Sequence, residues 1–387
     1  MQGNKIQGNN QTRYGLIGCG MMGQEHLRNI ALLPGVEIAT VFEPDPGMQD
    51  LTKSLAPQAR MVAGIEDVFA TPGLDAVLIT SPNHCHAAQI AMVVAQTPVP
   101  ILVEKPVCVS VAEARALETL AGQAGVPIWV GMEYRYMPAI AKMIDQVGRQ
   151  GASAAPVMLT VREHRYPFLP KVGNWNRFSK NTGGTLVEKC CHFFDLMRLI
   201  MKADPIRLFA SGAMNHNHRD EIYDGRPSDI LDNAYVVLDF PGSRRAMLEL
   251  CMFAEASEYQ EEIIAVGASG KITCRVPGPS RFWPEDIMGP QPTAELVVEH
   301  REPRRRERQD IPVDPVLLQA GDHNGSTFYQ HEKFLAVVRG TGAVEVTLVD
   351  GINAALIGLA AEHSAATGTM IDLSAGPYRL VGNSGRG

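Results

Sequence analysis

A glycine-rich segment follows the first apolar run of the chain. The run Tyr14–Ile17 leads into GCGMMG over residues 18–23, and a helical pattern comes next. In such a strand–turn–helix setting the first glycine permits a tight turn, the second lets backbone approach a pyrophosphate, and the third lets helix and strand pack closely. Amide groups at the helix start would bind the phosphates. The alternative to a dinucleotide site is a turn that merely needs glycines. The expected cofactor-binding residues are Gly18, Gly20, Met21, Met22 and Gly23.

One acidic residue bears on the choice of cofactor. Glu43 ends the second predicted strand, 20 residues after Gly23. An acidic residue at that place accepts hydrogen bonds from the ribose hydroxyls of a dinucleotide. A carboxylate there repels a 2′-phosphate, and the sequence EPDP over residues 43–46 brings no arginine. We therefore expect NAD, with NADP less favoured; a surface Glu in a turn is the alternative.

Polar side chains also follow two later predicted strands. Ser81, Asn83 and His84 come after the run that ends at Thr80, and Glu104-Lys105 comes after the run Ile101–Val103. Ligands bind beyond the carboxyl ends of strands in an open parallel sheet, so we expect these residues to border the cofactor and the crevice. Polar groups at a helix start, or a chance surface pair, are the alternatives.

A histidine and two carboxylates share one predicted helix face. Glu188 and His192 are four residues apart, and Asp195 is three further on. This spacing fits a metal site or an acid/base histidine oriented by a carboxylate. A metal needs further ligands, and none is evident, so we predict no metal. A histidine with a pKa near 6.5 suits proton transfer at neutral pH. A helix face paired with Arg or Lys is the alternative.

Three other segments combine hydrogen-bonding and aromatic side chains. They are residues 162–166, 175–177 and 322–324. Such a composition suits a polyhydroxylated ligand, with Trp175 stacking on an apolar sugar face, and Arg165 and His323 are the other candidates. Solvated loops would have a similar composition.

The elements that must position these residues divide the chain in two. From Thr12 to about Val130, short apolar runs alternate with amphipathic helical segments, which predicts a parallel sheet with helices on both sides. After Pro138, consecutive strands with few helices predict a largely antiparallel sheet. Helices are expected over residues 184–201, 327–338 and 349–366, an exposed insertion over 277–292, and a solvated loop in the basic run 301–308. The predicted parts are a flexible tail at 1–11, a cofactor domain at 12–136 and a substrate-binding and oligomerisation domain at 137–387.

Composition excludes several classes of protein. The chain has 387 residues, 45% hydrophobic and 20% charged, with a net charge of −7. It is therefore not a disordered or collagen-like chain, and we expect neither nucleic acid nor membrane as a partner. The polar start has no apolar stretch of the secretory kind. The seven cysteines show no CxxC pair, so reduced thiols in a cytoplasmic protein are expected.

The order of these motifs resembles the Gfo/Idh/MocA family of oxidoreductases. The resemblance runs from Arg13 to Leu373 and rests on GxGxxG, Glu43, Glu104-Lys105-Pro106, GxxxRxxP over residues 131–138, and Gly183-Gly184 with Glu188-xxx-His192. It implies a Rossmann domain followed by an α/β domain with an open, mainly antiparallel sheet. It also implies oxidation or reduction of one carbon of a sugar or cyclic polyol with NAD(P).

The resemblance assigns roles to single residues. Lys105 matches the family's catalytic lysine and His192 its catalytic histidine. This chain has Glu188 where the family commonly has Asp, and Cys190 where it has Gly. Arg135, from the GxxxRxxP motif, joins the substrate-binding candidates, and Glu188 joins the catalytic ones.

These features predict a hydride transfer between nicotinamide and a secondary alcohol carbon. His192 would take the hydroxyl proton, and Lys105 would donate a charge-assisted hydrogen bond to the same oxygen. The substrate would be an inositol, an aldose, an anhydrosugar or a glycoside. The alternatives are an NAD-dependent glycosidase and a non-catalytic sugar- or NAD-sensing regulator on the same fold.

Two strands bear on assembly. In Asn233–Phe240 and Arg245–Phe253 both faces carry apolar residues, whereas a sheet with one face in water should alternate. Too few helices are predicted to cover the second face. We therefore expect a homodimer or homotetramer, formed by packing this face on itself. The alternative is that residues 277–292 fold over the sheet.

Overall fold

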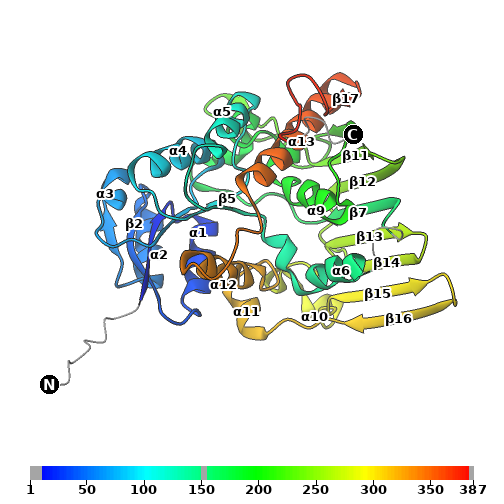
Figure 1. The fold of residues 1–387 in the computed structure, drawn as a ribbon, viewed down its shortest axis with the longest axis horizontal. Coiled ribbons are helices and arrows are strands. Elements are labelled where there is room, and N and C mark those ends of the chain that lie inside the picture. Colours follow the sequence, from blue (N-terminus) through cyan, green and yellow to red (C-terminus); the bar gives the residue numbers. More distant parts are fainter. Residues whose placement is uncertain (1–10, 150–154, 383–387) are drawn as a thin grey trace.

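The computed structural model describes residues 11–149 and 155–382, so all of the predicted tail except Gln11 lies outside the described residues. Two large β-sheets lie side by side in this part of the chain, with helices packed on them (Figure 1). No helix in these two ranges has the length and apolar content to cross a membrane.

The first sheet confirms the predicted parallel arrangement. Its strand order is β3-β2-β1-β4-β5-β6, and every pair is parallel. All residues of β4 and β5 are buried, as expected where helices cover both faces. The strands are β1 Thr12–Ile17, β2 Val36–Phe42, β3 Arg60–Val62, β4 Ala76–Ile79, β5 Ile101–Glu104 and β6 Ile128–Gly131, and the helices between them are α1 Met21–Ile30, α2 Pro46–Leu55, α3 Ile65–Phe69, α4 His86–Gln96 and α5 Val111–Ala121.

The second sheet is mixed and mostly antiparallel, also as predicted. Its order is β16-β15-β14-β13-β7-β12-β11-β8-β17, and only the pair of β7 with β12 is parallel among the described residues. The strands are β7 Met158–His164, β8 Arg207–Ala213, β11 Asn233–Phe240, β12 Arg244–Cys251, β13 Glu261–Gly267, β14 Gly270–Val276, β15 Glu295–His300, β16 Arg305–Asp310 and β17 Ile371–Asp372; β9 Ile222–Tyr223 and β10 Arg226–Pro227 form a separate small pair.

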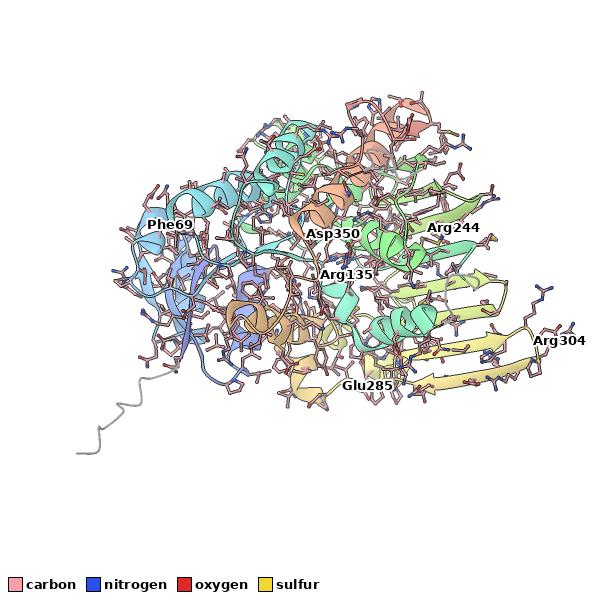
Figure 2. All side chains as sticks on the ribbon, viewed as in Figure 1. Phe69, Arg135, Arg244, Glu285, Arg304 and Asp350 are labelled. Carbon is pink, nitrogen blue, oxygen red and sulfur yellow. The ribbon has the colours of Figure 1, made fainter. Side chains whose placement is uncertain are left out.

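The basic run differs from the prediction of a solvated loop. Arg305–Asp310 forms β16 at the edge of the sheet, and Arg304 lies at the tip of the hairpin with β15 (Figure 2). Every residue of β16 is exposed, so no apolar alternation marks the strand in the sequence. Charged side chains suit an edge strand because they discourage pairing with another chain. Strand β14 was not predicted either.

Helices α6 Pro138–Arg149, α9 Cys191–Met201 and α13 Leu348–Thr367 pack on one face of the second sheet. Helix α12 Ser326–Val338 instead contacts α1 of the first part. The α12 and α13 bounds match the predicted ones to within a residue. The expected helix 184–201 is divided into α8 Thr185–Glu188 and α9, and α6 and the short α11 Pro315–Ala320 were not predicted.

The other face of the second sheet is open in the single chain. Val236 and Leu238 of β11 are buried, whereas Tyr235 and Val237 are 56% and 42% exposed, and Phe209 of β8 is 42% exposed. The segment 277–292 holds the short helix α10 Glu285–Met288 and leaves these side chains exposed. It therefore does not cover this part of the sheet, contrary to the alternative considered above.

Candidate active site

The glycine-rich turn has the shape that a pyrophosphate needs. Gly18 has φ +82°, and a Cβ there would lie 2.6 Å from the Cα of Ser81. A Cβ on Gly23 would lie 2.8 Å from the Gly18 carbonyl oxygen, whereas one on Gly20 would meet nothing within 4 Å. Gly18 and Gly23 therefore serve close packing, and Gly20 leaves open space beside the start of α1. Within the described part of the chain no side chain caps that start, so its amides are available to an anion.

The first two residues of α1 differ in exposure. Met21 is 40% exposed and Met22 is half-buried. Both present backbone amides to the turn, because the first N–H groups of a helix have no partner within it.

Glu43 is fixed beside this turn. It is 6% exposed, and its carboxylate accepts hydrogen bonds from the amides of Cys19 (2.5 Å) and Asp45 (2.8 Å). Each carboxylate oxygen keeps a second lone pair for a ribose hydroxyl. Its place at the end of β2, bonded to the glycine turn, fits the dinucleotide prediction.

The segment after β4 lies at the same edge of the first sheet. Ser81 Oγ donates to Gln89 Oε1 at 2.5 Å. Asn83 is buried, and its Nδ2 has no hydrogen-bond partner among the described residues. His84 contacts Trp175 edge-on, with ring centroids 6.1 Å apart. Asn83 thus offers an unused buried donor, and His84 contacts the predicted substrate part.

Glu104 is not open to the cofactor. Its Oε1 lies 2.9 Å from Nε2 of His26, whose Nδ1 lies 2.7 Å from Nε2 of His331. Burial raises the pKa of Glu104, but His26 outweighs burial and the net shift is downward. The structure therefore uses Glu104 to join β5 to α1 and α12, and does not place its carboxylate as the predicted cofactor contact.

Lys105 is half-buried at the junction of the two parts. Its Nζ donates to the Glu188 carbonyl oxygen at 3.0 Å. Burial disfavours the charged form, but the acidic groups around it, Cys191 and Glu133 first, outweigh burial and raise its pKa. The side chain is therefore a cation at neutral pH.

His192 lies on α9 and is also buried. Its ring stacks on Tyr134 at 4.2 Å between centroids, with 9° between the planes. Burial, and then the charges of Lys105 and Lys189, hold its pKa well below the usual value. The imidazole is therefore neutral at pH 7 and can accept a proton. Its Nε2 lies 3.6 Å from Oε1 of Glu133.

The carboxylates expected to orient His192 have other partners. Glu188 pairs with Lys171 at 2.9 Å. Asp195 accepts from Nε of Arg135 at 2.6 Å and from Nη2 at 2.5 Å. Glu188 ends α8 whereas His192 lies on α9, so the two residues do not share one continuous helix as the spacing predicted. Arg135 lies at the centre of the molecule (Figure 2) and is used by Asp195, so it is not free for substrate as predicted.

Arg165 is likewise engaged. Its Nη1 lies 3.7 Å from Glu163, which also pairs with Lys189 at 2.9 Å. Lys189 donates to the Tyr134 hydroxyl at 2.5 Å. The pKa of Lys189 is lowered, chiefly by burial. Arg165 therefore belongs to a cluster of charged side chains that contacts Tyr134 through Lys189, and its direct contact with substrate stays a prediction.

Two predicted substrate residues do reach the site. The Trp175 ring lies 4.5 Å from the Lys171 ammonium, on the loop that faces His84. His323 Nδ1 lies 2.7 Å from Oε1 of Glu25. Burial opposes a charge on His323, but Glu25 outweighs it and raises its pKa to about 9.

Glu133 is the site residue that sequence analysis missed. It begins the short 3-10 helix η2 Glu133–Tyr136 after β6 and is 1% exposed. Its Oε1 lies 3.6 Å from His192 Nε2 and 3.8 Å from His323 Nε2, and neither oxygen has a hydrogen-bond partner among the described residues. Burial, and then Glu104, raise its pKa to about 7. Its position just after a parallel strand, which singled out Lys105, is the signal that could have found it.

Comparison with known proteins agrees with this geometry. Residues 12–132 match the oxidoreductase family's NAD-binding Rossmann fold, and residues 154–373 match that family's C-terminal alpha/beta domain. The chain belongs to the Gfo/Idh/MocA oxidoreductase family. The resemblance predicted from the motifs is therefore confirmed, and with it an NAD-binding Rossmann fold in an oxidoreductase.

Relatives in this family are similar over much of their length. The scyllo-inositol 2-dehydrogenase (NAD(+)) of Bacillus subtilis is 27% identical over 274 residues, 68% of this chain and 73% of that protein. The 1,5-anhydro-D-fructose reductase of Ensifer adhaerens is 21% identical and covers 94% of this chain and 99% of its own. A myo-inositol dehydrogenase structure from Corynebacterium glutamicum superposes with a TM-score of 0.72 at 21% identity, covering 95% of this chain and 100% of that one.

The residues described here fit the family's cofactor. The glycine turn, Glu43 and the unpartnered Asn83 amide lie along the carboxyl edge of the first sheet. No group of three or more His, Cys, Asp or Glu side chains within residues 11–149 and 155–382 is placed to hold a metal ion.

Proposed function

We propose that this family member is an NAD-dependent dehydrogenase that oxidises a secondary alcohol carbon of a sugar or cyclic polyol, or reduces the corresponding ketone. The observation that carries the proposal is the convergence of a half-buried cation, Lys105, and a neutral histidine, His192, around Glu133 at the end of the cofactor-binding sheet. The names of the relatives, inositol dehydrogenases and an anhydrofructose reductase, support a polyhydroxylated substrate.

Each residue has one role in this reaction. Bound NAD supplies the nicotinamide carbon that accepts the hydride. Lys105 Nζ donates to the substrate oxygen and stabilises the negative charge that develops there. His192 takes the hydroxyl proton on Nε2. Because its pKa is so low, the resulting imidazolium needs a partner, and the Glu133 carboxylate 3.6 Å away supplies it.

The same proposal assigns the cofactor contacts. Residues 12–136 form the cofactor part, and residues 137–387 bind substrate. Glu43 would select NAD over NADP through the ribose hydroxyls, because its carboxylate repels a 2′-phosphate. The remaining contacts come from the glycine turn with Met21 and Met22, and from Ser81, Asn83 and His84 after β4.

Substrate screening tests the function. The purified protein is assayed for NADH formation with inositols, aldoses, anhydrosugars and glycosides, with NAD and NADP in parallel. We expect NADH to accumulate with at least one of these substrates. Lys105→Met should reduce kcat by about 10²–10³, the usual effect of removing one stabilising donor, with little change in NAD affinity. Normal kcat in that variant, or glycoside cleavage without net NADH, would refute the proposal.

We also propose that the open sheet face forms a homodimer or homotetramer contact. Tyr235, Val237 and Phe209 are apolar or aromatic and exposed on neighbouring strands β11 and β8. A self-complementary face of this kind fits an isologous contact. The seven cysteines are all unpaired, which suits a reducing compartment, and we propose the cytoplasm.

A further inference from the structure

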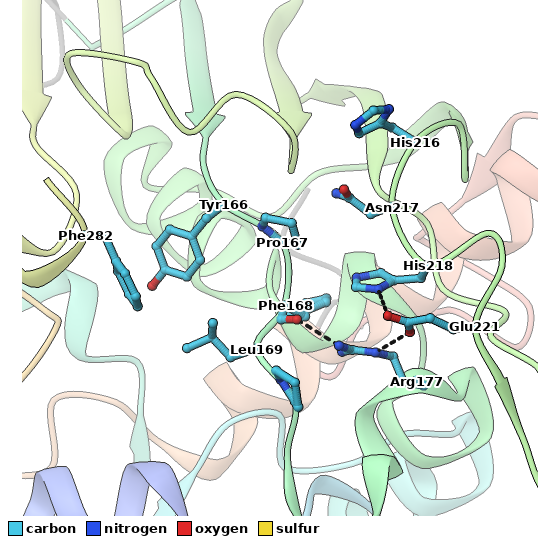
Figure 3. A pocket seen from close by; sticks show the side chains of 11 residues that line it. Tyr166, Pro167, Phe168, Leu169, Arg177, His216, Asn217, His218, Glu221 and Phe282 are labelled. Atoms are coloured by element: carbon cyan, nitrogen blue, oxygen red, sulfur yellow. Dashed lines mark hydrogen bonds and ion pairs between the residues drawn. The ribbon is translucent and has the colours of Figure 1, made fainter. Parts of the chain in front are cut away.

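A pocket in the second part of the chain has no role in the reaction proposed above. Its volume is about 540 Å³, within the range of about 300–1,000 Å³ of small-molecule sites. Its walls are residues 166–170 after β7, Arg177, the loop residues 216–218 and 221, and Phe282 (Figure 3). A pocket of this volume can hold a small molecule or one ring of a larger ligand.

One side of the pocket is apolar and aromatic. Tyr166, Phe168 and Phe282 contribute rings, and the centroids of Tyr166 and Phe282 lie 4.4 Å apart. Phe282 is 38% exposed. Flat aromatic surfaces of this kind pack against the C–H face of a ligand ring, while its polar groups point elsewhere.

The other side carries hydrogen-bonding groups whose charges are balanced. Arg177 Nε donates to Glu221 Oε2 at 2.8 Å, and its Nη2 donates to the Phe168 carbonyl oxygen at 3.0 Å. Nη1 has no hydrogen-bond partner among the described residues. The ring of His218 lies 3.0 Å from the second oxygen of Glu221. Figure 3 shows these groups along one wall.

This arrangement favours a neutral, hydroxylated ligand. Glu221 would repel a free anion, and Arg177 would repel a cation. A hydroxyl group can donate to Glu221 and accept from a nitrogen of Arg177 or His218. Together with the aromatic side, these groups match one sugar ring.

The segment that forms one wall of the pocket is held at both ends by ion pairs. Before it, Arg165 pairs with Glu163, which is linked through Lys189 to Tyr134, on which His192 stacks. After it, Lys171 pairs with Glu188, whose carbonyl oxygen accepts from Lys105. Residues 165–171 therefore link the pocket wall, through their partners, to Lys105 and His192.

We propose that this pocket binds a second, non-reacting sugar ring, so that the substrate is a neutral disaccharide or glycoside. The other ring is oxidised beside Lys105 and His192. This inference rests on the proposed function for the reaction, but the binding of two-ring ligands can be measured without turnover.

Calorimetry on the Lys105→Met variant with NAD present tests the inference. The probes are cellobiose, maltose and phenyl β-D-glucoside, each compared with glucose. We expect at least one two-ring probe to bind at least about 10-fold more tightly than glucose, because the second ring contributes its own contacts. The same advantage should appear in kcat/KM of the unaltered enzyme.

Two pocket variants and one control show where the advantage comes from. In the Lys105→Met background, Phe282→Ala and His218→Ala should each reduce the two-ring advantage by about 10-fold. Ile287→Ala is the matched control, because Ile287 is 80% exposed on the neighbouring helix α10 and does not line the pocket; it should change nothing.

The outcomes separate this inference from the proposed function. If no two-ring probe binds better than glucose, or if the advantage survives both pocket variants, the pocket does not bind a sugar ring. If the advantage depends on the pocket but no sugar yields NADH with the unaltered enzyme, the pocket inference stands and the dehydrogenase proposal fails.

Discussion

Replacing Glu133 with Gln tests the link between its carboxylate and His192. The substitution keeps the shape of the side chain and removes its charge. With Oε1 3.6 Å from His192 Nε2, the attraction to an imidazolium is about 4–5 kcal/mol at an effective dielectric constant of about 20. Since about 1.4 kcal/mol is a factor of ten, we expect kcat for alcohol oxidation at pH 8 to fall by about 10³ or slightly more.

The pH profile distinguishes a charge effect from a structural one. The pKa of Glu133 is about 7, so the unaltered enzyme should gain activity as pH rises through 7. Because the pKa of His192 lies well below its usual value, this acid limb belongs to Glu133 and not to the histidine. In Glu133→Gln the limb should disappear, and the ratio between the two enzymes should shrink about tenfold per pH unit below 7.

The stability of Glu133→Gln should change in the direction opposite to its activity. The pKa of Glu133 in the folded protein, about 7, lies above its unfolded value of about 4.3. The folded state therefore resists ionisation, and stability is lost as pH rises from about 4.3 to about 7. Glu133→Gln removes this penalty, so Tm at pH 8 should rise while activity falls; the effect corresponds to at most about 4 kcal/mol.

A second buried carboxyl provides the control. Burial raises the pKa of Glu362 to about 7, and its Oε1 accepts from the Leu186 amide at 2.8 Å. Glu362→Gln should also raise Tm at pH 8 but leave the pH profile of kcat unchanged. An acid limb that survives in Glu133→Gln would refute the role given to Glu133.

Three further predictions concern other parts of the molecule. Glu43→Ser should narrow the preference for NAD over NADP, measured as the ratio of kcat/KM values, because the repulsion of the 2′-phosphate is gone; a ratio already at or below one in the unaltered enzyme would contradict the role of Glu43. His192→Ala should lower kcat by about 10²–10⁴, with NAD affinity largely kept, and a normal kcat would move the base elsewhere. Val237→Glu, on the open sheet face, should reduce the mass in light scattering to near 42 kDa. In an isologous contact the new carboxylate of one subunit would be buried near the same carboxylate of the other, and the two would repel each other. An unaltered protein already at that mass would refute the oligomer.

The fold could be predicted from the sequence, and Lys105 and His192 could be singled out as candidates, because their signals are local. Apolar runs, the glycine turn and the position of Lys105 after a strand can all be read within a few residues. The edge strand β16 could not be predicted, because a fully exposed strand shows no alternation of apolar and polar residues. The ion pairs of Glu188 and Asp195 could not be predicted from the sequence, because their partners, Lys171 and Arg135, come from other segments of the chain.

Glu133 could be recognised only once the chain was folded. It lies 59 positions from His192 and 190 from His323 in the sequence, yet both rings come within 4 Å of its carboxylate. Helical spacing relates residues on one element only. The contacts that set the charge and pKa of this site connect three separate segments, and no spacing rule describes them.

Helix α12 has a consequence for engineering. The ring of Phe334 lies 5.9 Å from Tyr14 and 6.4 Å from Trp129, and His331 bonds His26 beneath them. A fragment ending near residue 136 would expose the rings of Tyr14 and Trp129, both buried in the whole chain, to water, so the cofactor half should not be stable when expressed alone. A chimera that exchanges cofactor halves between relatives would have to carry the matching α12 along with the first 136 residues.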